Sequence, residues 1–132
     1  MTFASIRLIA ADITTMVAFY ELVTGQSAEW LAPQFAEIVT PGATLVIGSA
    51  ETVALFMEGS AEPGANRTAI LEFRVDDVDA EFTRLKDKVD VVIAPKLLPW
   101  GSRTAQFRDP EGTIISLFTP VTEAARARFG SR

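Results

Sequence analysis

Three charged residues have the type and the spacing to carry chemistry in this chain: Arg7, Glu72 and Arg74. Each falls on the polar face of a strand-like run, in which alternate side chains point the same way. A guanidinium suits an anionic or carbonyl group of a ligand, and the Glu72 carboxylate suits a general base. We expect Arg7 and Glu72 to face a common cavity, where they either recognise a ligand or form a purely structural ion pair.

The absence of histidine and cysteine narrows this chemistry further. Histidine is the usual base at neutral pH and the commonest metal ligand, and the cysteine thiolate is a strong nucleophile and metal ligand. Without either, we expect no Ser–His nucleophile, no thiol chemistry and no disulfide. The acidic run Asp76, Asp77 and Asp79 lacks the spacing of a calcium loop and is interpreted as helix capping.

Aromatic side chains supply a second kind of candidate site, a wall against which flat ligands can stack. They come from runs expected to rim a concave face: Trp30, Phe35, Trp100, Phe107 and Phe118. Arg103 and Gln106 are expected to flank the same opening, and strand alternation leaves open which of them points inward. Ordinary core or dimer packing is the alternative explanation for these aromatic residues.

Composition limits the classes of partner. The 132 residues fit one domain, and a net charge of −5 argues against a broad basic surface for nucleic acid or anionic membranes. No run approaches the ~20 apolar residues of a membrane span, and no signal peptide is evident. We therefore expect a cytoplasmic protein with small-molecule or protein partners.

The elements that must position these residues are short strands and two amphipathic helices. In the first half, Asp12 or Thr14 caps a helix that Gly25 ends, and the segment 51–57 fits either a strand or a short helix. Strands are expected at residues 5–11, 28–31, 35–40 and 43–48. Residues 60–66 have the small and polar composition of a linker.

The second half begins with a strand at residues 68–75, on which Glu72 and Arg74 share a face. Asp77 caps a helix that runs to about Lys88, followed by a strand at 91–94 and a loop at 95–101. Asp109-Pro110-Glu111-Gly112 is a tight turn within a β-hairpin, because proline presets φ and glycine accepts a positive φ. On its second arm Ile115 and Leu117 face one way, and Ser116 and Phe118 the other.

The two halves repeat each other. Ser5 aligns with Ile70 such that strand alternation, capping aspartate and helix stripe coincide, and Pro41 aligns with Pro110, which sets Ile47 against Ser116. This predicts an α+β fold of two βαβββ modules whose sheets form a concave cavity, with helices on the outer face. The expected boundaries are one domain over 1–132, with modules at about 4–59 and 67–120 and a C-terminal helix at 121–130.

Three segments carry a resemblance to the vicinal oxygen chelate superfamily, which includes glyoxalases, bleomycin-resistance proteins and extradiol dioxygenases. They are the strand-Asp-helix start ending in FYE at residues 6–21, the FRVDDVD run at 73–79, and Trp100-Gly-Ser-Arg before the Asp-Pro-x-Gly hairpin. The resemblance covers about residues 5–120. It implies the paired-module fold and, in metal-dependent members, a metal held by residues on the inward strand positions.

Carried over by motif, those ligand positions are Ser5, Ile70 and Ser116, with Ile47 as the repeat equivalent of Ser116. None is His, Asp, Glu or Gln, and a hydroxyl is a poor ligand for a divalent cation without stronger donors around it. The resemblance therefore implies a member without a metal or other cofactor, in which Ile47, Ile70 and Ser116 line the ligand cavity instead.

The leading hypothesis is a metal-independent binding protein of the bleomycin-resistance type that sequesters an antibiotic or another aromatic or polycyclic compound as a homodimer. The alternative is a metal-independent lyase, isomerase or cyclase that uses Glu72 as base and Arg7 or Arg103 to stabilise an oxyanion. Interaction within a larger assembly is a third hypothesis. Homodimer formation rests on the resemblance and on the segment 121–129, whose apolar side needs a surface to cover.

Overall fold

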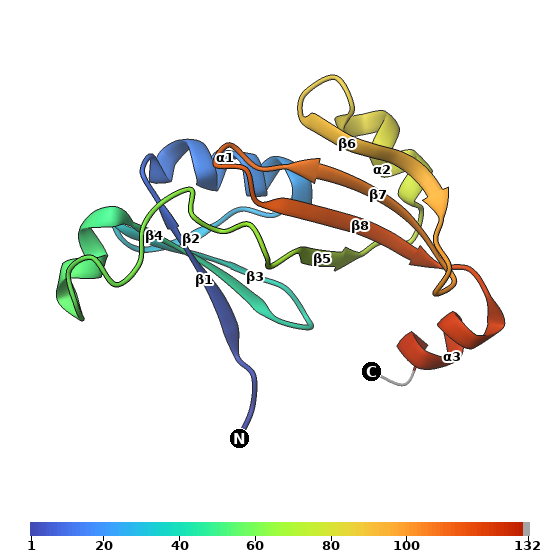
Figure 1. Cartoon of the computed structure of the whole chain (residues 1–132), viewed down its shortest axis with the longest axis horizontal. Coiled ribbons are helices and arrows are strands. Elements are labelled where there is room, and N and C mark those ends of the chain that lie inside the picture. Colours follow the sequence, from blue (N-terminus) through green and yellow to red (C-terminus); the bar gives the residue numbers. More distant parts are fainter. Residues whose placement is uncertain (131–132) are drawn as a thin grey trace. The chain divides into compact units, whose positions relative to one another are not determined.

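The computed structural model describes residues 1–130, and the chain divides into two compact units, Met1–Asn66 and Arg67–Arg132 (Figure 1). The first unit contains β1 (Ser5–Ala10), α1 (Ile13–Thr24), β2 (Glu29–Ala32), β3 (Phe35–Val39), β4 (Thr44–Ser49) and the 3-10 helix η1 (Ala50–Leu55). The second contains β5 (Leu71–Arg74), α2 (Val78–Leu85), β6 (Asp90–Leu97), β7 (Ser102–Arg108), β8 (Ile114–Pro120) and α3 (Glu123–Gly130). The element order repeats between the units.

Each unit forms a four-stranded mixed sheet with the same connectivity. The strand orders are β1-β4-β3-β2 and β5-β8-β7-β6, and in both sheets the first strand pairs in parallel with the last while the other neighbours are antiparallel. This confirms the α+β fold built from two βαβββ modules. None of the helices within residues 1–130 has the length and apolar character needed to cross a membrane.

Helix α1 begins and ends where its capping residues require. The Asp12 side chain accepts a hydrogen bond from the Thr15 backbone N–H at 3.2 Å, and Gly25 closes the helix with φ 69° and an N–H donated to the Glu21 carbonyl. The buried side chains of this helix recur at helical spacing and are Met16, Val17, Tyr20 and Val23. The predicted cap and stripe are confirmed.

Helix α2 is capped as predicted but is shorter than predicted. The Asp77 side chain accepts from the Ala80 N–H at 3.1 Å. The helix ends at Leu85 rather than near Lys88, because the Lys88 N–H bonds the Leu85 carbonyl in a tight i to i−3 turn. That turn frees Asp90 to begin β6.

Strand β6 is longer than predicted and takes in part of the expected loop. Its span Asp90–Leu97 includes Pro95, which lies between Ile93 and Lys96 where the pairing register with β7 shifts. β6 is the edge strand of its sheet, where proline and bulges are tolerated because one row of backbone groups needs no partner.

The predicted turn at residues 109–112 is present and tightly bonded. The Gly112 N–H donates to the Asp109 carbonyl at 3.0 Å, and Gly112 has φ 90°. The buried Asp109 carboxylate accepts from the N–H groups of Glu111 and Thr113 at 2.8 and 3.0 Å. This turn fixes the register of β7 against β8.

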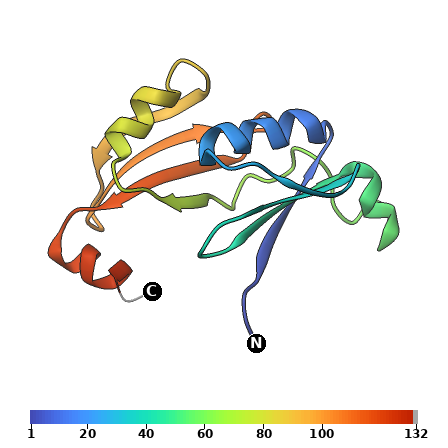
Figure 2. The ribbon, with the colours of Figure 1, turned by 180° about the vertical axis from the view of Figure 1, so that it is seen from behind.

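The two faces of the second sheet are covered by different helices. Phe107 on β7 stacks on Phe82 of α2, with ring centroids 6.1 Å apart, whereas Phe118 on β8 contacts Phe129 of α3 at 4.9 Å. Figures 1 and 2 show α2 and α3 on opposite sides of this sheet. Strand alternation decides which side chain meets which helix.

The structure overturns one of the two reasons for expecting a homodimer, namely that the apolar side of segment 121–129 needs a second chain to cover it. Ala125 is 1% exposed, and Phe129 packs on Phe118 of the same unit. The N–H groups of Val121 and Thr122 both donate to the Gly101 carbonyl. The apolar side of α3 thus covers its own sheet, so it does not require a second chain.

Candidate functional site

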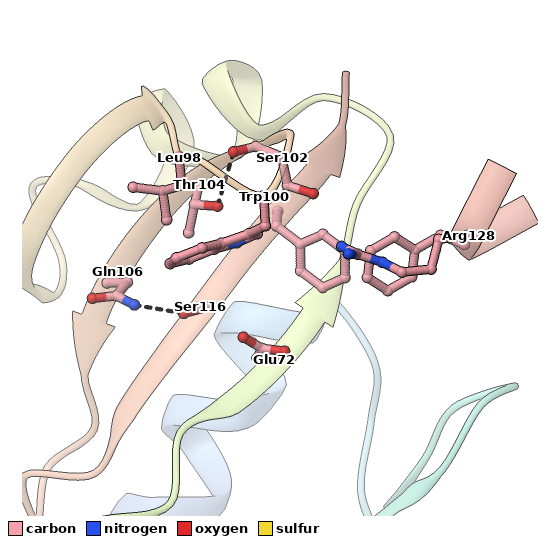
Figure 3. A pocket seen from close by; sticks show the side chains of 10 residues that line it. Glu72, Leu98, Trp100, Ser102, Thr104, Gln106, Ser116 and Arg128 are labelled. Carbon is pink, nitrogen blue, oxygen red and sulfur yellow. Dashed lines mark hydrogen bonds between the residues drawn. The ribbon is translucent and has the colours of Figure 1, made fainter. Parts of the chain in front are cut away.

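The second unit holds a pocket of about 220 Å³ on the sheet face that carries α3 (Figure 3). Its lining combines a polar floor, an aromatic wall, one carboxylate and one guanidinium. The lining residues are Glu72, Leu98, Trp100, Ser102, Thr104, Gln106, Ser116, Phe118, Arg128 and Phe129.

A row of three side chains crosses the floor from strand to strand. Glu72 on β5 and Gln106 on β7 both pair with Ser116 on β8, so the three side chains lie side by side on one face. The Gln106 amide N–H donates to the Ser116 Oγ at 2.9 Å. Among the described residues these side chains make no other hydrogen bond, so the amide Oε1 and the Ser116 hydroxyl hydrogen can bond a ligand.

Two further polar groups continue the floor along β7. Ser102 and Thr104 precede Gln106 at alternate positions and are 2% and 4% exposed. Among the described residues the Ser102 Oγ has no hydrogen-bond partner although it is buried. A buried hydroxyl without a partner costs free energy, so a ligand group that bonds it would recover that cost.

The aromatic wall comes from the loop after β6, from β8 and from α3. Trp100 is 58% exposed and lies in a tight turn closed by the Gly101 N–H and the Leu98 carbonyl. Phe118 and Phe129 form the tilted ring pair, and the Arg128 guanidinium lies 4.7 Å above the Phe129 ring. Figure 3 shows Trp100 and Arg128 entering the pocket from the loop and from α3.

The structure brings together several of the side chains predicted to bind a ligand. Glu72, Trp100, Ser116 and Phe118 all line this pocket, and so does Gln106. Gln106 therefore takes the inward position that sequence alternation leaves open between it and Arg103.

The structure corrects the placement of Arg103 and Phe107. Both alternate with Gln106 on β7 and face α2 instead of the pocket: Phe107 is fully buried against Phe82. The Arg103 guanidinium makes a two-pronged ion pair with Asp79 of α2, at 2.7 and 2.8 Å. The hydrogen bond from Arg103 lowers the pKa of Asp79, and the same bond raises the pKa of Arg103.

Arg74 and Ile70 do not line the pocket either. The Arg74 guanidinium donates to the Phe129 carbonyl at 3.1 Å and so holds the last turn of α3, which a cation at a helix C-terminus does favourably. Ile70 precedes β5 and is 47% exposed. Arg74 thus supports a wall of the pocket from outside it.

Four predicted residues belong to the first unit, namely Arg7, Trp30, Phe35 and Ile47. The Arg7 guanidinium lies 5.1 Å from the centroid of the Phe35 ring, a cation–π contact within that unit. Trp30 on β2 is 45% exposed.

The structure places Ile47 on the other face of its sheet from the one that the sequence repeat predicts. It pairs with Leu8 and Ala36 and is fully buried, whereas Val46 pairs with Arg7 in the way that Ser116 pairs with Glu72. The structural equivalent of Ser116 is therefore Val46, one residue earlier than the sequence repeat suggests. A slip of one residue transfers a strand side chain to the opposite face of its sheet.

The positions that the resemblance assigns to metal ligands do not fit a metal ion. Ser5, Ile70 and Ser116, with Val46 in place of Ile47, offer two hydroxyls and two aliphatic groups. The Ser116 Oγ already accepts a hydrogen bond from Gln106. Within residues 1–130 no group of three or more His, Cys, Asp or Glu side chains could hold a metal ion.

Sequence reasoning missed half of the lining. Ser102 and Thr104 could have been found by extending the period-two pattern of Gln106 back along the strand. Arg128 and Phe129 carry no such signal, because only the packing of α3 brings them to this face, and Leu98 lies in the loop after β6, where no strand alternation applies.

Comparison with known proteins identifies relatives over most of the chain. The family model of the Glyoxalase/Bleomycin resistance protein/Dioxygenase superfamily matches residues 2–117. The chain is 30% identical over 125 residues to the uncharacterized protein YraH of Bacillus subtilis (strain 168), covering 89% of this chain and 98% of that protein.

Solved structures show the same fold. A glyoxalase/bleomycin resistance protein/dioxygenase family enzyme from Burkholderia phytofirmans PsJN aligns with TM-score 0.78 and 21% identity, covering 89% of this chain and 98% of that one. A glyoxalase/bleomycin resistance protein/dioxygenase from Nocardioides aligns with TM-score 0.75 and 22% identity, covering 93% and 85%. At such identities the likeness concerns the fold alone.

Proposed function

The chain belongs to the glyoxalase/bleomycin resistance protein/dioxygenase superfamily, and we propose that it is a member that binds a small organic molecule without a metal ion. The observation that carries this proposal is the pocket of the second unit. Its aromatic side chains and hydrogen-bonding floor suit an organic ligand, and its donor set does not suit a cation that must lose its water shell.

The aromatic wall supports a planar ligand. A flat ring placed against Trp100 or Phe118 gains stacking as well as burial, while Gln106 and Ser116 fix its orientation by hydrogen bonds. The volume of about 220 Å³ is below the ~300–1,000 Å³ of a typical ligand site. We therefore narrow the ligand, within this pocket, to one ring system rather than a large polycycle.

Fluorescence of Trp100 tests the proposal. The chain has two tryptophans, so a Trp30→Phe variant leaves Trp100 as the single reporter. Titration with a panel of one- and two-ring antibiotics and metabolites should give saturable quenching with at least one compound. A Ser116→Phe variant, which fills the floor, should abolish that quenching and serves as the control.

The binding role and an enzymatic role differ in what happens to the ligand. A binding protein returns the compound with its mass unchanged and in stoichiometric amount. The alternative enzyme would use Glu72, which lines the pocket, but Arg103 is committed to Asp79 on the other face and cannot stabilise an oxyanion there. A product of altered mass formed in many turnovers, and lost in Glu72→Gln, would overturn the binding role.

A homodimer remains a prediction. The apolar side of α3 no longer supports it, because that side packs on the sheet of its own unit. A different surface feature supports it: Leu55, Phe56 and Met57 are consecutive apolar side chains that are 85%, 56% and 68% exposed. Light scattering after size-exclusion chromatography should give twice the chain mass, and a Phe56→Ser variant should shift it toward the monomer.

A further inference from the structure

Glu72 is the one lining residue that brings an uncommitted charge to the pocket. Among residues 1–130 its carboxylate has no hydrogen bond and no ion pair, although it lies beside Ser116 in the floor row. Figure 3 shows the Glu72 carboxylate on the same side of the sheet as Trp100, Gln106 and Ser116. We propose that the pocket selects a small planar organic cation, such as an amidine or a protonated nitrogen heterocycle, an inference that rests on the proposed binding function.

The cation in the lining, Arg128, is already engaged. Its guanidinium lies 4.7 Å from the centroid of the Phe129 ring, at the α3 side of the pocket, and the residue has a further interaction within the chain. Glu72 lies on β5, across the sheet from β7. Beside the floor row itself, the charged side chain that a ligand meets is therefore Glu72, the strand neighbour of Ser116.

The aromatic residues favour the same charge. A cation near the face of tryptophan or phenylalanine is attracted by the negative face of the ring, whereas an anion is repelled by it. Trp100 and Phe118 line the pocket that holds Glu72. A planar cation can thus stack on a ring and make a charge-assisted hydrogen bond to a carboxylate at once, whereas a neutral ligand of equal shape offers the carboxylate only the weaker uncharged bond and an anion is repelled.

The polar floor matches the remaining groups of such a ligand. The Gln106 Oε1 can accept from a second N–H of an amidine, since the amide nitrogen is bonded to Ser116. The Ser102 Oγ, buried and without a partner among the described residues, can bond either a donor or an acceptor. The Glu72 carboxylate and the Gln106 Oε1 are thus two acceptors beside an aromatic wall, and together they suit a planar ligand with two N–H donors.

Three probes of one shape and different charge test the inference. Benzamidinium, benzamide and benzoate are titrated into the Trp30→Phe protein while Trp100 quenching is followed. Benzamidinium should bind about tenfold more tightly than benzamide, and benzoate more weakly than both. Because the Glu72 side chain is exposed, 0.5 M salt should reduce the preference for benzamidinium and leave benzamide unchanged.

Matched variants locate the effect. Glu72→Gln should remove the preference for benzamidinium over benzamide, whereas Asp87→Asn, which deletes one exposed charge that does not line the pocket, should preserve it. Equal affinity for the three probes, tighter binding of benzoate, or a preference that survives Glu72→Gln would refute the cation inference while leaving the binding function intact. Failure of every planar compound to quench Trp100 would refute both.

Discussion

Replacement of Gly101 by alanine should weaken the attachment of α3 and with it a wall of the pocket. Gly101 has φ 94°, and an added Cβ would overlap the Thr122 Oγ1 and lie 3.0 Å from the Ala125 Cβ. The left-handed backbone costs a non-glycine residue about 1–2 kcal/mol, and overpacking adds about 1–3 kcal/mol. We expect Gly101→Ala to lower the free energy of unfolding by about 2–5 kcal/mol.

A double-mutant cycle with Thr122 separates the two causes. Thr122→Ala alone removes the Oγ1 that accepts from the Ala125 N–H, which should cost about 1 kcal/mol as the loss of a helix cap. In the Gly101→Ala background the same change also removes the clash. The double variant should therefore be about 1–3 kcal/mol more stable than the sum of the single effects implies.

Urea denaturation followed by circular dichroism measures the cycle, and Trp100 fluorescence in the Trp30→Phe background reports whether the loop moves. Gly101→Ala should also weaken binding of the planar probe, since Trp100 and Phe129 both depend on this packing. Effects that add within about 0.5 kcal/mol would refute the contact between the Gly101 loop and α3.

Three further predictions follow from the two faces of the second sheet. Phe107→Leu should cost about 1–3 kcal/mol of unfolding free energy and leave the probe affinity unchanged, whereas Phe118→Leu should weaken binding; the reverse order would contradict the assigned faces. Arg74→Gln should speed hydrogen exchange in α3 with a loss of stability of about 1 kcal/mol, and unchanged exchange would argue against its bond to the helix end. Asp79→Asn should lower the melting temperature slightly at pH 7, because the hydrogen bond from Arg103 that lowers the pKa of Asp79 also stabilises the folded state. This stabilisation is fully present above the ordinary pKa of 3.8 and disappears as the pH falls through the lowered pKa. A difference in melting temperature between the two proteins that persists in strong acid would contradict it.

The two repeated modules could be predicted because capping residues, hydrophobic pattern and turn residues all indicate the same helices and strands. The capping residues Asp12 and Asp77, the glycine at 25 and the turn at 109–112 act locally, and each has the bonds expected of it. The end of α2 and the length of β6 could not be predicted, because a tight turn at Lys88 and a bulge around Pro95 depend on tertiary packing.

The site was harder to predict than the fold because faces are set by single-residue register. Strand alternation predicts the pocket-facing side of Glu72, Ser116 and Phe118, because the strands that carry them are well defined in the sequence. The prediction for Ile47 is wrong because an alignment one residue out of register reverses the face of every side chain on a strand. The contribution of α3 depends on a long-range contact of Phe129, for which the local pattern gives no signal.

The affinity of a planar probe before and after exhaustive chelation, with the metal content of the same sample determined by mass spectrometry, tests the metal-independent site most directly. The proposed function predicts the same dissociation constant in both samples and metal far below one ion per chain. One tightly held divalent ion per chain, whose removal abolishes binding and whose return restores it, would contradict the proposal.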